Sequence, residues 1–313
     1  MLQDYLNVMV LFLVVGLGVV LAKIRWLNLS SNDVLTKILL NVALPSTLIL
    51  SIGKDFSRSE FLMLLPDIIL PTAAILTLMV MASIVAKLIK VEQADKGLFI
   101  GLCSMSSTIF FGIPVTLAVF GSHGLPYALM TYASQTVIYW TLGLYLLEKG
   151  VEGNSPKNGV VVTLIKDIVN MPLIAFFVGV GILLMGLKMP GVIESFLASL
   201  SGMTSALAML IVGTIIFISG IKNIKLTRAL CAVVVFRFIV APLVVLLLGW
   251  VFSINDQMIK ITTLICALPI PNATVILAEK YKINVTFATG ALTCSIGVYL
   301  IFLPVILFCI HHI

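Results

Sequence analysis

The chain has 313 residues, of which 61% are hydrophobic and only 10% are charged. A soluble domain usually carries roughly 25% charged residues, so this composition excludes a water-soluble globule and indicates a protein that is surrounded by lipid. The formal net charge is +6. Because most Lys and Arg residues fall in short loops between apolar runs, we interpret them as topology signals and expect no nucleic-acid partner.

The apolar runs are long and continuous, as in membrane-spanning helices and unlike the short alternating strands of a barrel. A helix needs about 20 apolar residues to cross a hydrocarbon core of roughly 30 Å. The N-terminus, MLQDY, lacks the basic region of a signal peptide, so the first run is expected to be retained. An amphipathic segment over residues 160–169 is expected to lead into the sixth span. The ten predicted spans cover residues 5–22, 34–52, 61–89, 97–120, 125–147, 171–187, 200–219, 226–252, 259–277 and 285–310.

The charges of the loops predict the orientation of the spans. Ten spans put both termini on the same side, where the loops contain Lys54, Arg58, Lys188 and Lys260. The loops on the opposite side contain a larger set: Lys23, Arg25, Lys87, Lys90, Lys96, Lys149, Lys157, Lys222, Lys225, Arg228, Lys280 and Lys282. Since Lys and Arg collect in cytoplasmic loops, we predict a multi-pass protein of the cell (plasma or inner) membrane with both termini extracytoplasmic.

A polar stretch near the middle of the chain divides the spans into five and five. Residues 1–148 form a first repeat, residues 149–159 a short cytoplasmic linker, and residues 160–313 a second repeat. Because five is odd, the second repeat must enter the membrane in the opposite orientation, an arrangement that recurs in transporters. The predicted fold is therefore an all-α integral membrane protein with ten transmembrane helices in two inverted five-helix repeats.

Two spans contain helix-breaking residues at matched positions. Gly112 and Pro114 fall in the fourth span, and Pro269 and Pro271 fall in the ninth. Proline frees a backbone carbonyl, and such a group is tolerated at membrane depth only inside protein or beside a wet cavity. If the two helices cross at their breaks, their half-helix N-termini form a cradle for an anion. Polar residues flank both breaks and complete the predicted site: Ser106, Ser107, Thr108, Asn272 and Thr274.

Arg237 lies deep in the eighth span, where a charge is costly and usually faces a cavity or a partner. Two interpretations stay open. The guanidinium is a countercharge for an anionic substrate, or it forms a structural pair with a carboxylate or with helix-end carbonyls. Asp67 in the third span is a candidate partner or a proton-coupling group, and we favour a structural role for it.

The alternative for each break is a purely structural kink, in which Ser and Thr side chains donate hydrogen bonds to carbonyls of their own helix. Matched breaks in two spans favour the binding site over this alternative. Gln135 and Tyr139 in the fifth span are interpreted as core packing. Weaker supporting candidates for the site lie in the second span: Asn41, Pro45 and Ser46.

Several chemical motifs are absent from the sequence. It contains no GxxxxGK[ST] phosphate loop, no HExxH metalloprotease motif and no TVGYG filter of a potassium channel. The five cysteines have no paired spacing and all fall inside apolar segments, so we expect neither disulfides nor a zinc site. We therefore expect no enzyme activity, no cofactor and no metal site.

At the two breaks the sequence resembles the auxin efflux carrier family, which includes the plant PIN-FORMED auxin carriers and bacterial permeases for small organic acids. The resemblance is carried by STIFFGIP, which ends at Pro114, and by ALPIPNATVILAEKY, which begins at Ala267. It implies a scaffold and a transport domain, with the fourth and ninth helices crossing in the latter. It also implies an anion bound at the crossover, elevator-type movement and homodimers.

Two features depart from the family pattern. Ser107 stands where the family usually has an asparagine, which puts the substrate specificity of that contact in doubt. The long cytoplasmic loop of many plant members is here reduced to the short linker, so regulation through that loop is not expected.

These features together predict a secondary carrier of a small organic anion, a mono- or dicarboxylate. Coupling to H⁺, coupling to Na⁺ and uncoupled uniport all stay open, and membrane lipids are the expected surroundings. The rival interpretation is a membrane receptor or regulatory subunit that binds a ligand without moving it.

Overall fold

The computed structural model describes residues 2–55, 57–149, 171–219 and 226–312. In this part of the chain the backbone forms helices and turns and no strand, which confirms the all-helical prediction. The predicted lead-in over residues 160–169, and the linker after Lys149, lie outside the described residues.

Seven of the described helical stretches are long and apolar enough to cross a membrane. They correspond to the first, second, third, fourth, seventh, eighth and tenth predicted spans: Leu6–Lys23, Leu29–Gly53, Arg58–Leu88, Gln93–Phe120, Gly191–Ile218, Arg228–Val251 and Val285–His312. The sixth appears as the shorter apolar helix α11 (Met171–Met185). The chain is therefore a helical, multi-pass membrane protein, and the count of ten spans stays a prediction.

The helices gather into two compact units that do not coincide with the two halves of the sequence. Unit 1 comprises Met1–Pro66, Ile109–Leu129 and Val169–Ile218. Unit 2 comprises Asp67–Thr108, Met130–Ile168 and Ser219–Ile313. Each unit therefore takes segments from both predicted repeats, because long-range packing joins helices that are distant in the chain.

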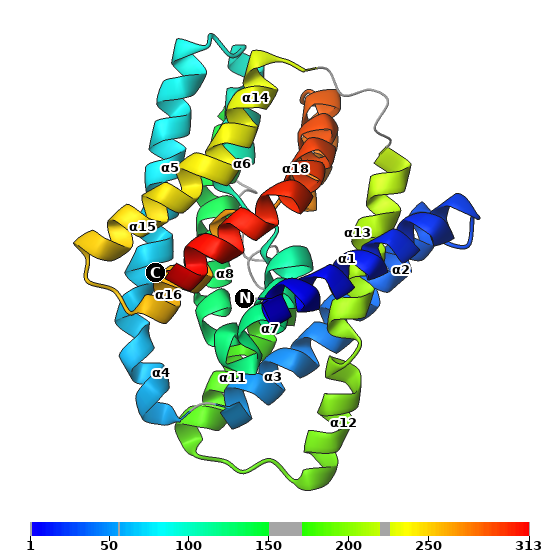
Figure 1. Ribbon diagram of the computed structural model, residues 1–313, viewed down its shortest axis with the longest axis vertical. Helices are drawn as coiled ribbons and strands as arrows, with labels where there is room; N and C mark the ends of the chain where they lie inside the picture. Colours follow the sequence, from blue (N-terminus) through cyan, green and yellow to red (C-terminus); the bar gives the residue numbers. More distant parts are fainter. Residues whose placement is uncertain (1, 56, 150–170, 220–225, 313) are drawn as a thin grey trace. The chain divides into compact units, whose positions relative to one another are not determined.

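Unit 1 is built from helices of the first, second, sixth and seventh spans, together with the start of the third, the end of the fourth and the start of the fifth. Within it α3 packs against α11 and α12, and α1 packs against α7 (Figure 1). Its principal helices are α1 (Leu2–Lys23), α2 (Leu29–Ile38), α3 (Leu44–Asp55), α4 (Arg58–Leu64), α7 (Ile113–Phe120), α11, α12 (Gly191–Ser201) and α13 (Thr204–Ser219).

Unit 2 contains the remaining spans and most of the buried polar side chains considered below. Within it α5 packs against α6 and α15, α15 against α16, and α14 against α18 (Figure 1). Its helices are α5 (Ile69–Leu88), α6 (Lys96–Ser104), most of α8 (Leu125–Ile138), α9 (Leu144–Lys149), α14 (Arg228–Val235), α15 (Ala241–Val251), α16 (Asp256–Cys266), α17 (Asn272–Lys280) and α18 (Val285–His312).

Three spans widen into a π-helical turn just before a proline. The turns η1 (Leu39–Ala43), η4 (Thr108–Gly112) and η8 (Phe236–Val240) are each followed, two residues after they end, by Pro45, Pro114 and Pro242 respectively. Proline cannot donate to the carbonyl four residues before it, and its ring crowds that carbonyl. The wider π turn relieves this crowding without ending the helix. The three spans therefore continue as helix through these prolines.

The fourth span is interrupted earlier than the sequence indicates. Helix α6 ends at Ser104, Met105 is extended, and the helix resumes only at Thr108. Gly112 ends the π turn and Pro114 lies in the first turn of α7, so the expectation that these two residues interrupt the helix is wrong. The break falls instead on consecutive hydroxyl residues, which compete for backbone hydrogen bonds and disfavour a helix interior.

The ninth span is interrupted where the prolines predict. Helix α16 ends at Cys266, Pro271 is extended, and α17 begins at Asn272. Pro269 and Pro271 lie inside this break, so the prediction of a broken helix is confirmed here.

Candidate functional site

The two breaks meet through a backbone hydrogen bond in unit 2. Ser107 N donates to Pro269 O at 2.9 Å. Both partners lie outside regular helix, so each supplies a backbone group that its own helix leaves unpaired. The fourth and ninth spans are therefore joined at their interruptions, as predicted for crossing broken helices.

Gln135 of α8 holds the first break in place. Its side-chain amide accepts from Ser106 N at 2.9 Å and donates to Ser106 O at 2.7 Å. One amide side chain thus pairs both backbone groups of a buried residue. The sequence interpretation of Gln135 as core packing is wrong, since the side chain replaces two missing helical hydrogen bonds.

The second break has a comparable support from α18. Ser295 is completely buried, and its Oγ accepts from Ile270 N at 3.1 Å and donates to Leu292 O at 2.7 Å. Sequence reasoning did not single out Ser295. Its spacing held a signal, because QTVIY (residues 135–139) and SIGVY (residues 295–299) both place a polar residue four positions before a tyrosine, which puts the two side chains on one helix face.

Thr131 of α8 and Tyr139, the first residue of the π turn η6 (Tyr139–Gly143) that continues α8, extend the same face to the ninth span. Tyr139 Oη donates to Thr274 Oγ1 at 3.2 Å, and the Thr131 and Thr262 hydroxyls lie 3.3 Å apart. Thr131, Gln135 and Tyr139 are spaced by four residues, so they form one polar stripe along the helix. Tyr139, interpreted from the sequence as core packing, therefore has a hydrogen-bonding role as well.

Arg237 lies within η8 and its side chain is completely buried. Nε donates to Leu268 O at 3.1 Å, and Nη2 donates to Leu268 O and to Ser106 Oγ, the latter at 2.7 Å. Nη1 has no hydrogen-bond partner among the described residues. The guanidinium thus reaches both breaks, and the helix-end carbonyl foreseen as one alternative for Arg237 is present.

The charge of Arg237 faces two helix C-termini. Ser106 and Leu268 each stand two residues after the end of a helix, α6 and α16 respectively. A helix C-terminus carries roughly half a negative charge, so two of them offset about one positive charge. Within the described part of the chain no carboxylate pairs with Arg237, and Arg237 is the one charged residue in its buried set.

Three groups at the breaks keep unused hydrogen-bonding capacity. Beside Nη1 of Arg237, the Ser107 hydroxyl and the Asn272 amide make no side-chain hydrogen bond to the described residues. Asn272 begins α17 and is half-exposed, and no side chain caps this helix. By contrast, the N, O and Oγ atoms of Ser106 all have hydrogen-bond partners, and Thr108 Oγ1 donates to Ser106 O at 3.4 Å.

In the part of the chain that the structure describes, the remaining predicted residues form no side-chain hydrogen bond with this cluster. Asp67 lies in the short 3-10 turn η2 (Leu65–Ile68), is half-exposed and forms no pair with Arg237. Gly112 and Pro114 belong to unit 1. Asn41, Pro45 and Ser46 also belong to unit 1.

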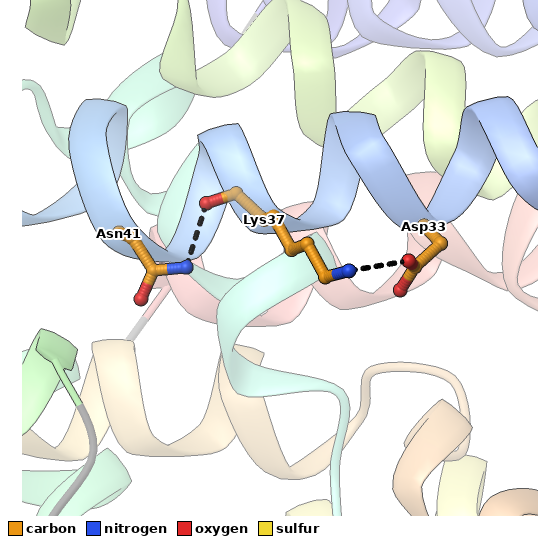
Figure 2. Close-up of polar contacts among 3 residues, drawn as sticks. All are labelled: Asp33, Lys37 and Asn41. Atoms are coloured by element: carbon orange, nitrogen blue, oxygen red, sulfur yellow. Dashed lines mark hydrogen bonds and ion pairs between the residues drawn. The ribbon is translucent and has the colours of Figure 1, made fainter.

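The polar candidates of the second span bond to their own helix. Asn41 Nδ2 donates to Lys37 O at 2.9 Å, and Lys37 Nζ forms an ion pair with Asp33 at 2.7 Å (Figure 2). Ser46 Oγ donates to Val42 O at 2.8 Å. These contacts are local supports of a helix that continues through Pro45.

Comparison with known proteins is consistent with this architecture. Residues 5–307 match the membrane transport protein family. The chain is 27% identical to an uncharacterized transporter of Methanothermobacter thermautotrophicus over 307 residues, 96% of either chain. It is 24% identical to an uncharacterized transporter of Methanocaldococcus jannaschii over 262 residues, 83% of either chain. The match confirms the resemblance seen at the two breaks: the chain belongs to the membrane transport protein family, the family of the auxin efflux carriers.

Proposed function

We propose that the protein is a secondary carrier of a small organic anion, a mono- or dicarboxylate, across the cell membrane. The cargo binds where the fourth and ninth spans are interrupted. Unit 2, which holds both breaks, carries it by an elevator-type movement relative to unit 1. This proposal includes ten spans in two inverted repeats, with both termini extracytoplasmic.

The observation that carries the proposal is the uncapped start of α17 beside the joined breaks. The first backbone N–H groups of a helix lack intrahelical acceptors and carry about half a positive charge. Here Pro271 precedes the helix and no side chain caps it. A carboxylate is the natural acceptor for such a helix start, and the half-exposed Asn272 adds an amide donor.

The other site residues have distinct proposed roles. The Ser107 hydroxyl and Nη1 of Arg237 supply further donors to the cargo. Pro269 and Pro271 keep the ninth span open, since neither can donate to a helical carbonyl. The hydrogen-bonded residues Ser106, Thr108 and Thr274 hold the frame around them.

The proposed inverted repeat has structural support in the way the breaks are held. Gln135, from the span that follows the first break, bonds that break, and Ser295, from the span that follows the second, bonds the second. Equivalent supports from equivalent spans are expected when two halves share one architecture.

Counterflow in proteoliposomes tests the function. Vesicles loaded with an unlabelled carboxylate should accumulate the labelled one, and a panel of mono- and dicarboxylates should compete with it. Saturable binding without any exchange would instead support the receptor interpretation. Flux that does not saturate and shows no counterflow would indicate a channel.

The variant Asn272→Ala tests the site. Loss of one donor to a charged cargo removes about 1.5–3 kcal/mol of binding, so substrate affinity should fall at least about tenfold. The matched control is Gln257→Ala, which removes an exposed amide from the start of α16 in the same broken span. If both variants bind and transport normally, the cargo does not contact Asn272.

A further inference from the structure

We propose that the Arg237 guanidinium is a tethered cation that fills a cation site built by the two broken helices. In a sodium-coupled carrier such a site would hold the coupling ion. The protein would therefore move its cargo without Na⁺. This inference rests on the proposed carrier function. It adds a role for Arg237, which is to hold the two breaks together.

The ligands of the guanidinium are of the kind that bind Na⁺ in other carriers. Unwound backbone carbonyls and half-helix C-terminal ends coordinate Na⁺ in transporters with discontinuous helices. Arg237 takes the Leu268 carbonyl just beyond the C-terminus of α16 and the Ser106 hydroxyl just beyond the C-terminus of α6. A hard cation prefers such oxygen ligands, and here the guanidinium already occupies them.

The charges around the site favour one resident cation and leave no place for a second. Two helix ends offset about one positive charge, and no carboxylate pairs with Arg237 within the described residues. A free Na⁺ at the same place would face the guanidinium at short range with no acid between them. Like charges in a poorly solvated interior repel strongly, so the site cannot hold both.

The chemistry of arginine makes this cation permanent. The guanidinium stays protonated in proteins and presents its donors as a planar fork. Its Nε and Nη2 are committed to the two breaks, and Nη1 has no partner. Arg237 therefore holds the two breaks together through Nε and Nη2, while its third nitrogen stays available to the anionic cargo.

The first experiment uses the unaltered protein. Counterflow is measured in proteoliposomes with Na⁺, K⁺ or choline as the cation on both sides, without a pH gradient. The tethered cation predicts equal exchange in all three media. Exchange that requires Na⁺ would overturn this inference and leave the carrier function intact, whereas no exchange in any medium would overturn the carrier function.

The second experiment removes the tethered cation. Arg237→Ala should lower exchange at least about tenfold, as expected for the loss of a charged hydrogen-bonding group. Added guanidinium ion should restore exchange in this variant, because it can re-enter the vacated site. Urea has nearly the same shape without the charge and should restore nothing. The control Arg228→Ala, at an exposed arginine at the start of α14, should respond to neither.

Thermal unfolding supplies a readout that does not need transport. Guanidinium, and to a smaller degree Na⁺, should raise the melting temperature of Arg237→Ala relative to urea and choline at equal concentration. Neither should raise that of the unaltered protein. If Arg237→Ala does not insert, Arg237→Lys replaces it and should keep exchange independent of Na⁺. Absence of any guanidinium effect on the alanine variant, or Na⁺ dependence of the lysine variant, would contradict a cation site.

Discussion

The two units of the molecule use polar side chains differently. In unit 1, Asn41 and Ser46 bond to their own helix, and glycines allow helices to approach closely: a Cβ on Gly213 would lie 2.1 Å from Val15 O. In unit 2, Gln135 and Arg237 bond to segments far away in the chain. Intact membrane helices can cross through close apolar packing of small residues. The broken helices need hydrogen-bond partners from distant segments of the chain.

One cluster in unit 1 shows that the position of a helix end, and not the unit, decides this difference. Thr47 Oγ1 lies 2.9 Å from Ser201 Oγ and 2.7 Å from Thr204 Oγ1. Helix α12 ends at Ser201 and α13 begins at Thr204. At these places long-range polar contacts gather where a span is interrupted, because the backbone groups released there are costly to leave unpaired in lipid.

The largest expected effect comes from removing the clamp on the first break. Gln135→Leu leaves the backbone N–H of buried Ser106 without a partner, at a cost of about 1–3 kcal/mol, and leaves Ser106 O with only its local bonds from Thr108. Unfolding in detergent should therefore occur at a clearly lower temperature, and exchange should fall with it. Gln135→Glu still accepts from Ser106 N and, in the neutral form that a buried carboxyl takes, can donate to Ser106 O, so it should lose less than the leucine variant. An unchanged unfolding temperature in Gln135→Leu would show that the first break is stable without the Gln135 side chain.

A smaller effect is expected at the helix crossing of unit 1. Gly213→Ala places a methyl group against the backbone of α1, which forces the helices apart and costs about 1–3 kcal/mol. The control Gly181→Ala adds a methyl where no atom lies within 4 Å. Thermal unfolding should separate the two variants, while the KM for the cargo should stay unchanged in both. A raised KM in Gly213→Ala would show that the helix crossing in unit 1 also affects cargo binding, which would contradict the proposed difference between the units.

The smallest effect separates two neighbouring hydroxyl residues of α3. Thr47→Val removes the shared partner of Ser201 and Thr204 and should cost about 1 kcal/mol. Ser46→Ala removes only a bond to its own helix and should lie within about 0.5 kcal/mol of the unaltered protein. Equal melting temperatures for the two variants would contradict the importance of helix interruptions in unit 1.

Part of the site was readable from residue types. Pro269 and Pro271 predicted the break in the ninth span because proline acts on its own helix, through a missing donor and a clash with the preceding turn. The first break was placed wrongly at Gly112 and Pro114, since a π turn absorbs that proline. Gln135 was misread for a different reason: its two hydrogen bonds are made to a residue in another span, and no local pattern announces them.

Composition and hydropathy by themselves determined that this protein is a helical membrane protein, because a chain with so few charges can satisfy its backbone in lipid only through helices. Residue types also marked Arg237 as a buried charge that requires a partner. Only the tertiary structure decided which partner: the Leu268 carbonyl and the Ser106 hydroxyl, and not Asp67. The physical reason is that a cation in a low-dielectric interior is stabilised by whichever negative ends the fold brings to it, and here those are two helix C-termini.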